Sequence, residues 1–236
     1  MPAISLLEDM HVHSIFSDGA NTLEENFRVA KKRGLRALGC VDHVRASTAW
    51  LPAYVAAVDH LRGRGLRITA GVEAKLRDSE GHLDIPDDLA GIDLIYVADH
   101  KFPGVGGTQS PAEVRAAIAA RETQPADVFE LLIGATERAI ERYPNVVVAH
   151  LFSILPKLRL DECDVPRRRI AALAAVARRH GAMIEIDERW RCPSARTLTP
   201  FVEAGVRILA SSDSHRAATI GEYTYAAGVA AAFGAA

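Results

Sequence analysis

The side chains best suited to bind metal or carry protons in this 236-residue chain are its histidines. The sequence holds nine histidines but only three cysteines, Cys40, Cys163 and Cys192, which are far apart and form no CxxC pair. A disulfide framework and a thiolate zinc site are therefore excluded. Scarce cysteine is also typical of the reducing cytoplasm, where we expect the protein to act.

Six of the histidines stand at the ends of short apolar segments, together with several carboxylates. His11 and His13 are two residues apart on one such segment, so their side chains face the same side and can bind one ion. The candidate metal ligands are His11, His13, Asp18, His43, Glu73, His100, His150, Asp213 and His215. This set exceeds the roughly three or four ligands of one catalytic zinc. It suits about two or three ions that share a bridging carboxylate and act on a phosphoryl group, and it leaves zinc, manganese and iron open.

The other three histidines have simpler interpretations. His60 lies in the helical pattern AAVDHL and is expected to be solvated. His180 stands at the end of a predicted helix, where a positive charge suits the helix dipole. His82, in a turn after the third apolar segment, is close enough in sequence to approach the site.

Seven short apolar or β-branched runs predict buried strands. They cover residues 6–11, 37–41, 68–72, 94–97, 146–149, 183–186 and 206–210. A capping box at Thr22 begins a helix that ends at Gly34, and Ser110 with the following proline begins another. A third helix follows Asp164 and ends at Gly181. This alternation predicts a parallel sheet, open or closed.

Each predicted strand ends at a residue that can ligate a metal or transfer a proton. Besides the candidate ligands, these positions hold Asp42, Asp99, Glu185 and Asp187. In a β/α barrel the C-terminal ends of all strands lie on one face, where active sites form. Residues far apart in the sequence are therefore expected to meet in one pocket.

The composition excludes several other classes of protein. The 28 basic and 30 acidic residues give a net charge of −2, which disfavours nucleic acid as the partner. We expect no signal peptide, no membrane span and one domain over residues 1–236. The glycines from Gly104 to Gly107 lack the GK[ST] of a phosphate loop and are expected to form a loop over the site. No GxSxG occurs, which disfavours a serine nucleophile.

The ordered motifs resemble those of the PHP (polymerase and histidinol phosphatase) family. His11-Val-His13-Ser14 with Ser17-Asp18-Gly19 is similar to the opening HxHS…SDG signature of that family. The later motifs match in order and are Asp42-His43, Gly71-Val-Glu73, His100, His150 and Ser212-Asp213-Ser-His215. The resemblance extends from about residue 9 to about residue 221.

This resemblance implies an α/β fold, a distorted TIM-like (β/α)7 barrel with a trinuclear metal site at the C-terminal ends of its strands. By analogy, the first ion is held by His11, His13, Glu73 and Asp213. The second shares Glu73 and adds His100 and His150. The third uses Asp18, His43 and His215.

The implied reaction is hydrolysis of a phosphate ester, in which a hydroxide that bridges two ions attacks phosphorus. Asp213, His215 and His43 are the candidates for protonating the leaving group. Arg189 and Arg191 are candidates for bidentate phosphate contact. Arg45 and Lys101, beside ligand positions, are further candidates for substrate binding. Asp187 stands where the family often has asparagine, which adds a negative charge near the site.

Three functions are compatible with this resemblance. The first is a phosphatase acting on a small phosphorylated metabolite, with histidinol phosphate, a sugar phosphate or a nucleotide as possible substrates. The second is a phosphodiesterase or exonuclease, which ranks lower because no polymerase is attached and no basic surplus exists. The third is a non-catalytic module with a structural metal site, which the complete ligand set disfavours. The oligomeric state is left open.

Overall fold

A parallel sheet of seven strands, rolled into a nearly closed barrel, organises the chain in a computed structural model that describes residues 4–234. Its neighbours follow in the order β1 (Glu8–Val12), β2 (Ala37–His43), β3 (Arg67–Lys75), β4 (Leu94–Ala98), β7 (Val146–Val148), β8 (Met183–Asp187) and β9 (Ile208–Ser211). A short parallel bridge between Val12 and Ser214 links the first strand to the segment after the last. The His13 N–H donates to the Ser214 carbonyl at 2.9 Å and reinforces this closure.

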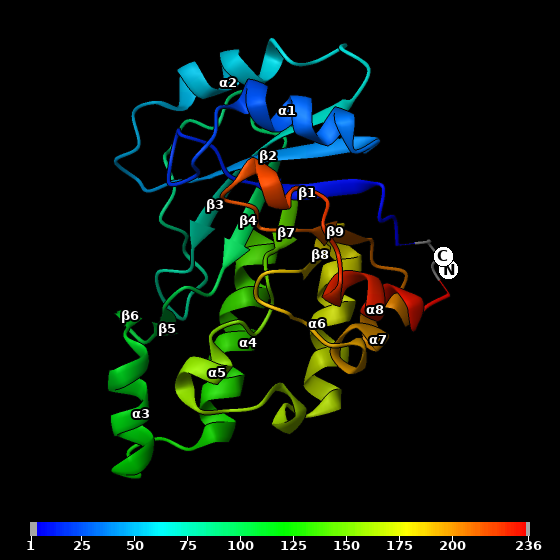
Figure 1. Cartoon of the computed structure of the whole chain (residues 1–236). Coiled ribbons are helices and arrows are strands. Elements are labelled where there is room, and N and C mark those ends of the chain that lie inside the picture. Colours follow the sequence, from blue (N-terminus) through cyan, green and yellow to red (C-terminus); the bar gives the residue numbers. More distant parts are fainter. Residues whose placement is uncertain (1–3, 235–236) are drawn as a thin grey trace.

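Helices follow most strands and cover the outside of the barrel. They are α1 (Leu23–Lys32), α2 (Leu51–Asp59), α3 (Pro111–Ala119), α4 (Pro125–Arg142), α5 (Leu155–Leu158), α6 (Arg167–His180), α7 (Ala195–Glu203) and α8 (Tyr225–Ala231), with 3₁₀ turns η1 (Glu162–Asp164) and η2 (Ala217–Thr219). Helices α1 and α2 lie on one side of the sheet, and α4 and α6 pack together on the opposite side (Figure 1). Within residues 4–234, no helix is long and apolar enough to cross a membrane.

The predicted secondary structure is confirmed for all seven strands and for the helix starts with recognisable caps. Thr22 and Ser110 each form a capping box, in which the side chain accepts an N–H from the third helical residue and a glutamate returns the bond. Helix α6 ends at Gly181, whose φ of 68° lies in the left-handed region that glycine adopts without strain.

Apolar side chains form two clusters, separated by the sheet. The larger one lies between the strands and the surrounding helices, and the smaller one includes Met10, Tyr96 and Leu209. The Tyr96 hydroxyl contacts the Met10 carbonyl and so links β4 to β1. The Tyr54 hydroxyl, from α2, lies 2.5 Å from the Cys40 carbonyl oxygen and 2.9 Å from that of Gly71. These buried tyrosines satisfy their polar ends and fix neighbouring strands in register.

The glycine-rich segment after β4 forms a small antiparallel hairpin, β5 (Phe102–Gly104) and β6 (Gly107–Gln109). Gly106 and Gly107 have φ values of 82° and 151°, so the tight turn requires residues without a Cβ. The C-terminal ends of β3 and β4 point toward the side of the molecule that carries this hairpin (Figure 1). All strands of the barrel present their C-terminal ends on the same face, which therefore collects the polar residues that follow them.

Candidate metal centre

The nine candidate ligands all come from segments at the C-terminal face of the barrel. His11 and Glu73 lie within β1 and β3, and His43 ends β2. The others lie in the loops after β1, β4, β7 and β9, and are His13, Asp18, His100, His150, Asp213 and His215. The structure brings all nine into one cluster.

Glu73 is the hub of this cluster. Its Oε1 lies 3.1 Å from His100 Nε2 and 2.9 Å from His150 Nε2. Its Oε2 lies 2.7 Å from His43 Nδ1. On the same side, Glu73 Oε2 lies 3.5 Å from His11 Nε2 and 3.6 Å from His13 Nε2. One buried carboxylate therefore faces five imidazoles, as a bridging ligand between ions would.

Asp18 and Asp213 extend the cluster toward solvent. Asp18 Oδ2 lies 3.5 Å from His43 Nε2 and 3.3 Å from His215 Nε2. Asp213 Oδ1 lies 3.0 Å from His13 Nε2 and 3.4 Å from His215 Nδ1. Three groups of donor atoms within 4.8 Å of one another result, namely His11, His13 and Glu73; His43, Glu73 and His100; and His13, Asp18, His43 and His215.

The cluster contains buried polar atoms that no protein group satisfies. Within the described residues, nine buried side-chain nitrogen or oxygen atoms lack a hydrogen-bond partner, and six of them belong to candidate ligands. These six are His11 Nε2, His13 Nδ1 and Nε2, Glu73 Oε2, His150 Nδ1 and Asp213 Oδ1. Leaving such atoms unpaired is costly, so their concentration at one place fits divalent cations well.

Protonation also suits metal binding at two positions. Burial alone would raise the pKa of Glu73, but His100 and His11 outweigh burial and hold that pKa well below its usual range. Burial lowers the pKa of His13 to about 4. An ionised carboxylate and a neutral imidazole are the forms that bind metal.

Two further carboxylates, those of Glu185 and Asp99, contact the candidate ligands and orient them. From the sequence, both residues were identified only as polar residues at strand ends. Glu185 Oε1 lies 2.9 Å from His11 Nδ1, which directs the other ring nitrogen toward Glu73. Glu185 Oε2 also accepts the His150 N–H at 3.0 Å. Asp99 Oδ1 lies 3.5 Å from His150 Nδ1. Such carboxylate–imidazole pairs fix the ring orientation of metal ligands.

Two further carboxylates hold the ligand-bearing loops. Asp42 accepts hydrogen bonds from the Ser14 N–H at 2.9 Å and from the Ser17 hydroxyl at 2.5 Å. Asp9 accepts from the Ser212 N–H at 2.9 Å and from the Gly221 N–H at 2.7 Å. The serines of the two sequence motifs therefore anchor the loops that carry Asp18 and Asp213.

Asp187 differs from the sequence-based expectation. Burial, together with repulsion from Glu185 and Asp213, raises the pKa of Asp187 well above its usual range. Its Oδ1 accepts the Trp190 backbone N–H at 2.7 Å. The raised pKa favours the neutral form of this carboxyl group, whereas the sequence predicts an additional negative charge here.

A cavity of about 700 Å³ opens above the cluster. Of the four basic residues expected to bind substrate, Arg45 and Arg189 line it. Arg189 Nη1 lies 2.5 Å from His215 Nδ1 and 3.5 Å from Asp213 Oδ2. Arg191 lies outside the lining, with its guanidinium 5.8 Å from the Tyr225 ring centre. Lys101 is exposed and also lies outside it.

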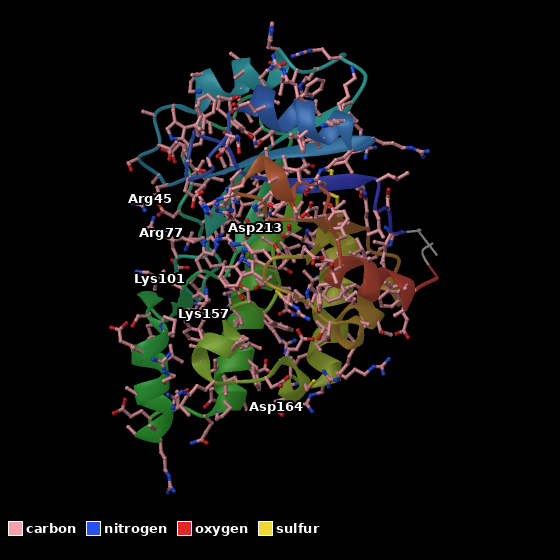
Figure 2. All side chains as sticks on the ribbon, viewed as in Figure 1. Arg45, Arg77, Lys101, Lys157, Asp164 and Asp213 are labelled. Carbon is pink, nitrogen blue, oxygen red and sulfur yellow. The ribbon has the colours of Figure 1, made fainter. Side chains whose placement is uncertain are left out.

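Sequence reasoning missed several residues that line the cavity. Trp190 donates its indole N–H to Asp213 Oδ2 at 2.9 Å, and Lys157 Nζ lies 4.1 Å from the Trp190 ring centre. Phe16 and Trp50 contact each other at the opposite wall, with ring centres 5.5 Å apart. The sequence did offer one indication, because Trp190 stands between Arg189 and Arg191 just after the end of β8. Figure 2 labels Lys157 and Asp213, with Lys157 below Asp213 in this view.

Two other expectations concern segments outside the cavity. The β5–β6 hairpin does not line it, so the expected glycine loop over the site is not formed by these residues. His60 and His180 are exposed at helix ends, as expected. His82 is also exposed, and its Nδ1 lies 3.0 Å from Asp78 Oδ2, away from the ligands.

Comparison with known proteins gives one family and similar sequences within it. The model of the PHP domain matches residues 9–188. A probable phosphatase of Caldicellulosiruptor bescii is 34% identical over 43% of this chain and 45% of its own length. The chain thus matches less than half the length of that relative. A phosphoribosyl 1,2-cyclic phosphate 1,2-diphosphodiesterase of Eggerthella lenta is 35% identical over 32% of this chain and 27% of its own length.

A solved structure is similar over almost the whole chain. The histidinol phosphate phosphatase of Lactococcus lactis, complexed with zinc, L-histidinol and phosphate, has a TM-score of 0.66. The match covers 97% of this chain and 94% of that protein at 17% sequence identity. At this identity the similarity establishes the fold, a barrel of the same kind.

Proposed function

This chain belongs to the PHP domain family, and on that premise we propose that it is a metal-dependent phosphatase of small phosphate monoesters. The observation that carries the proposal is the cluster around Glu73, in which six buried ligand atoms have no hydrogen-bond partner among the described residues, beside an open cavity. Similar curated proteins are described as probable phosphatases, which supports the same reaction class.

We propose that three divalent ions occupy this cluster, in the arrangement that the family resemblance implies. The first is held by His11, His13, Glu73 and Asp213. The second is held by Glu73, His100 and His150. The third is held by Asp18, His43 and His215. Donor groups of His11, His13 and Glu73 and of Asp18, His43 and His215 with His13 support the first and third positions, and the grouping of Glu73 with His100 supports the second. His150 and Asp213 join through their distances of 2.9 Å to Glu73 and 3.0 Å to His13. Zinc is favoured among zinc, manganese and iron, since the similar Lactococcus lactis structure contains zinc.

Bound ions of this kind supply Lewis acidity toward phosphoryl oxygens and activate water as a nucleophile. The protein's own contribution is to hold the phosphoryl group beside them. Arg189, whose guanidinium touches both His215 and Asp213, is placed to donate to phosphoryl oxygens. Lys157 adds a second positive charge over the ring of Trp190, whose indole N–H donates to Asp213. Both cations stabilise the charge that builds up in the transition state.

Three residues are candidates for protonating the leaving group. Burial alone would raise the pKa of Asp213, but the His13 ring, 3.0 Å away, and the charge of His11 hold that pKa well below its usual range. Asp213 is therefore the poorest proton donor of the three. His43 and His215 both line the cavity and are the better candidates. Each is also assigned to the third ion, so the proton would have to come from the ring nitrogen that does not bind metal.

The test is hydrolysis of 4-nitrophenyl phosphate by protein reconstituted separately with zinc, manganese and iron. We expect activity with at least one metal and its loss in His11→Ala and Asp213→Ala, with unchanged far-UV circular dichroism. His82→Ala, an exposed histidine outside the cluster, is the matched control and keeps full activity. Full activity in either ligand variant contradicts the assigned roles.

Phosphodiester hydrolysis is the second candidate, favoured by the similarity to the Eggerthella lenta cyclic phosphodiesterase. The same protein preparation distinguishes the two reactions. A monoesterase hydrolyses 4-nitrophenyl phosphate faster than bis(4-nitrophenyl) phosphate and leaves a cyclic ribose phosphate intact. The reverse order would replace the monoester proposal by the diester one.

A further inference from the structure

Two basic side chains stand beyond the metal ligands at the outer edge of the cavity, and the proposed chemistry does not use them. His43 and Glu73 are paired in register between β2 and β3. Arg45 and Lys75 lie two residues further along the same two segments, and both line the cavity. At a rise of about 3.3 Å per residue, they lie about 7 Å beyond the ligands in the strand direction.

This pair is held in place by one carboxylate. Asp84 Oδ2 lies 3.0 Å from Lys75 Nζ, and Asp84 Oδ1 accepts the Ala46 N–H at 2.9 Å. The Arg45 N–H donates to the Thr48 hydroxyl at 2.9 Å and fixes the same loop. Within residues 4–234, the Arg45 guanidinium makes no ion pair with a carboxylate. One positive charge of the pair is therefore available to a ligand.

Among residues 4–234, the cavity lining offers no carboxylate outside the candidate metal ligands that could receive a cationic group of a substrate. The carboxylates in its lining are Asp18, Glu73 and Asp213, and all three are candidate metal ligands. Its basic residues are Arg45, Lys75, Lys157 and Arg189. An ammonium group, such as that of histidinol phosphate, would enter a positive field without a partner, whereas an anionic group would be stabilised.

The four basic residues divide by position. Arg189 lies 3.5 Å from Asp213, and Lys157 contacts Trp190, which in turn donates to Asp213. Both basic residues therefore belong beside the phosphoryl group that reacts. Arg45 and Lys75 lie farther out. Resting on the proposed function, we propose that the substrate carries a second anionic group, phosphate or carboxylate, which Arg45 and Lys75 bind beyond the metal ligands, at the outer edge of the cavity.

The test uses aryl phosphates that differ only in the charge of the para substituent. They are 4-(carboxymethyl)phenyl phosphate, 4-ethylphenyl phosphate and 4-(2-aminoethyl)phenyl phosphate. We expect kcat/KM to be at least about tenfold higher for the carboxylate than for the ammonium compound, and this ratio to fall at high salt. 1,4-Phenylene bisphosphate, compared with the carboxylate compound, tells whether the second group is a phosphate or a carboxylate.

Two variants assign the preference to its residues. Arg45→Gln is expected to reduce the carboxylate-to-ammonium ratio of kcat/KM to near unity. Arg77→Gln removes a neighbouring positive charge, on the same side of the barrel in Figure 2, from a residue outside the cavity lining. This matched control keeps the ratio of the unaltered protein.

Binding gives a second readout that does not depend on turnover. Trp50 and Trp190, the two tryptophans of the chain, both line the cavity, so intrinsic fluorescence reports on it. Arylmethylphosphonates with the same three substituents are expected to bind in the same order of affinity. Equal or better binding and hydrolysis of the ammonium compound overturns the inference alone. Failure to hydrolyse any of the compounds, the neutral one included, contradicts the proposed function itself.

Discussion

The two ends of the barrel both carry many charged side chains, but they use them differently. At the N-terminal end, Glu8 lies 3.1 Å from Arg67 and 3.7 Å from Arg207, and Arg62 lies 2.7 Å from Asp93. At the C-terminal end, buried imidazoles and carboxylates retain donor atoms without any partner. The charged side chains named at the first end pair within the protein, whereas six buried atoms of the candidate ligands at the second end have no hydrogen-bond partner among residues 4–234. The comparison separates residues that serve stability from residues that serve function.

The largest expected effect comes from Glu73→Gln, which keeps the size of the hub residue and removes its charge. Because this carboxylate faces five imidazoles, we expect kcat to fall by about a thousandfold or more. The measurement is 4-nitrophenyl phosphate hydrolysis at saturating metal. A decrease of less than tenfold would show that the cluster is not the reactive centre.

Asp9 is a buried carboxylate with several hydrogen-bond donors, and its titration is expected to affect stability. Burial raises the pKa of Asp9 to about 6, although hydrogen bonds from Ser212 and Gly221 oppose the increase. The folded protein therefore holds the Asp9 proton more tightly than the unfolded chain does. The contribution of this proton to the free energy of unfolding is greatest below about pH 4 and is lost as the pH rises through about 6.

Comparison with Asp9→Asn isolates this contribution. The free energy of unfolding of the unaltered protein, relative to that of the variant, is expected to fall by about 2 to 3 kcal/mol between pH 4 and pH 7. Denaturant unfolding with a chelator present measures it without interference from metal binding. A difference that is constant with pH would refute the raised pKa.

Glu185→Gln tests the layer that orients the ligands. Its carboxylate fixes the His11 ring and the His150 backbone, so we expect metal affinity to fall by about 10- to 100-fold while the fold persists. Competition with a chromophoric chelator measures the affinity. Glu188→Gln is the control, because Glu188 accepts hydrogen bonds from backbone N–H groups of residues 224–226. An equal loss of metal affinity in both variants would contradict the role of Glu185 in orienting His11 and His150.

The smallest effect is expected at the opposite end of the barrel. Arg207→Met keeps the apolar stem and removes one of two positive charges beside Glu8, so stability should change by less than about 1 kcal/mol. Activity should stay within experimental error, as measured with the same aryl phosphate. A marked loss of activity would contradict the conclusion that charged residues at the N-terminal end of the barrel serve stability and not function.

The sequence was most informative where chemistry and local structure coincide. The seven strands were predictable because short β-branched runs alternate with capped helices. The convergence of the nine candidate ligands was predictable because parallel strands deliver their ends to one face. The cap residues Thr22 and Ser110 needed only local sequence.

Contacts set by packing were not predictable in the same way. Arg189 and Arg191 look equivalent in the sequence, but Arg191 has a φ of 54° and lies beside Tyr225. Lys157 reaches Trp190 because α5 packs near the loop after β8, which no local pattern encodes. The glycines after β4 allow a tight hairpin turn, and the hairpin replaces the expected loop over the site.

The metal content of protein purified without chelator tests the central claim most directly. Elemental analysis should find about three divalent ions per chain, as nine donors at roughly three per ion imply, and markedly fewer in Glu73→Gln. Activity should disappear on chelation and return when metal is restored. A folded, metal-free protein that hydrolyses phosphate esters at the full rate would contradict the account.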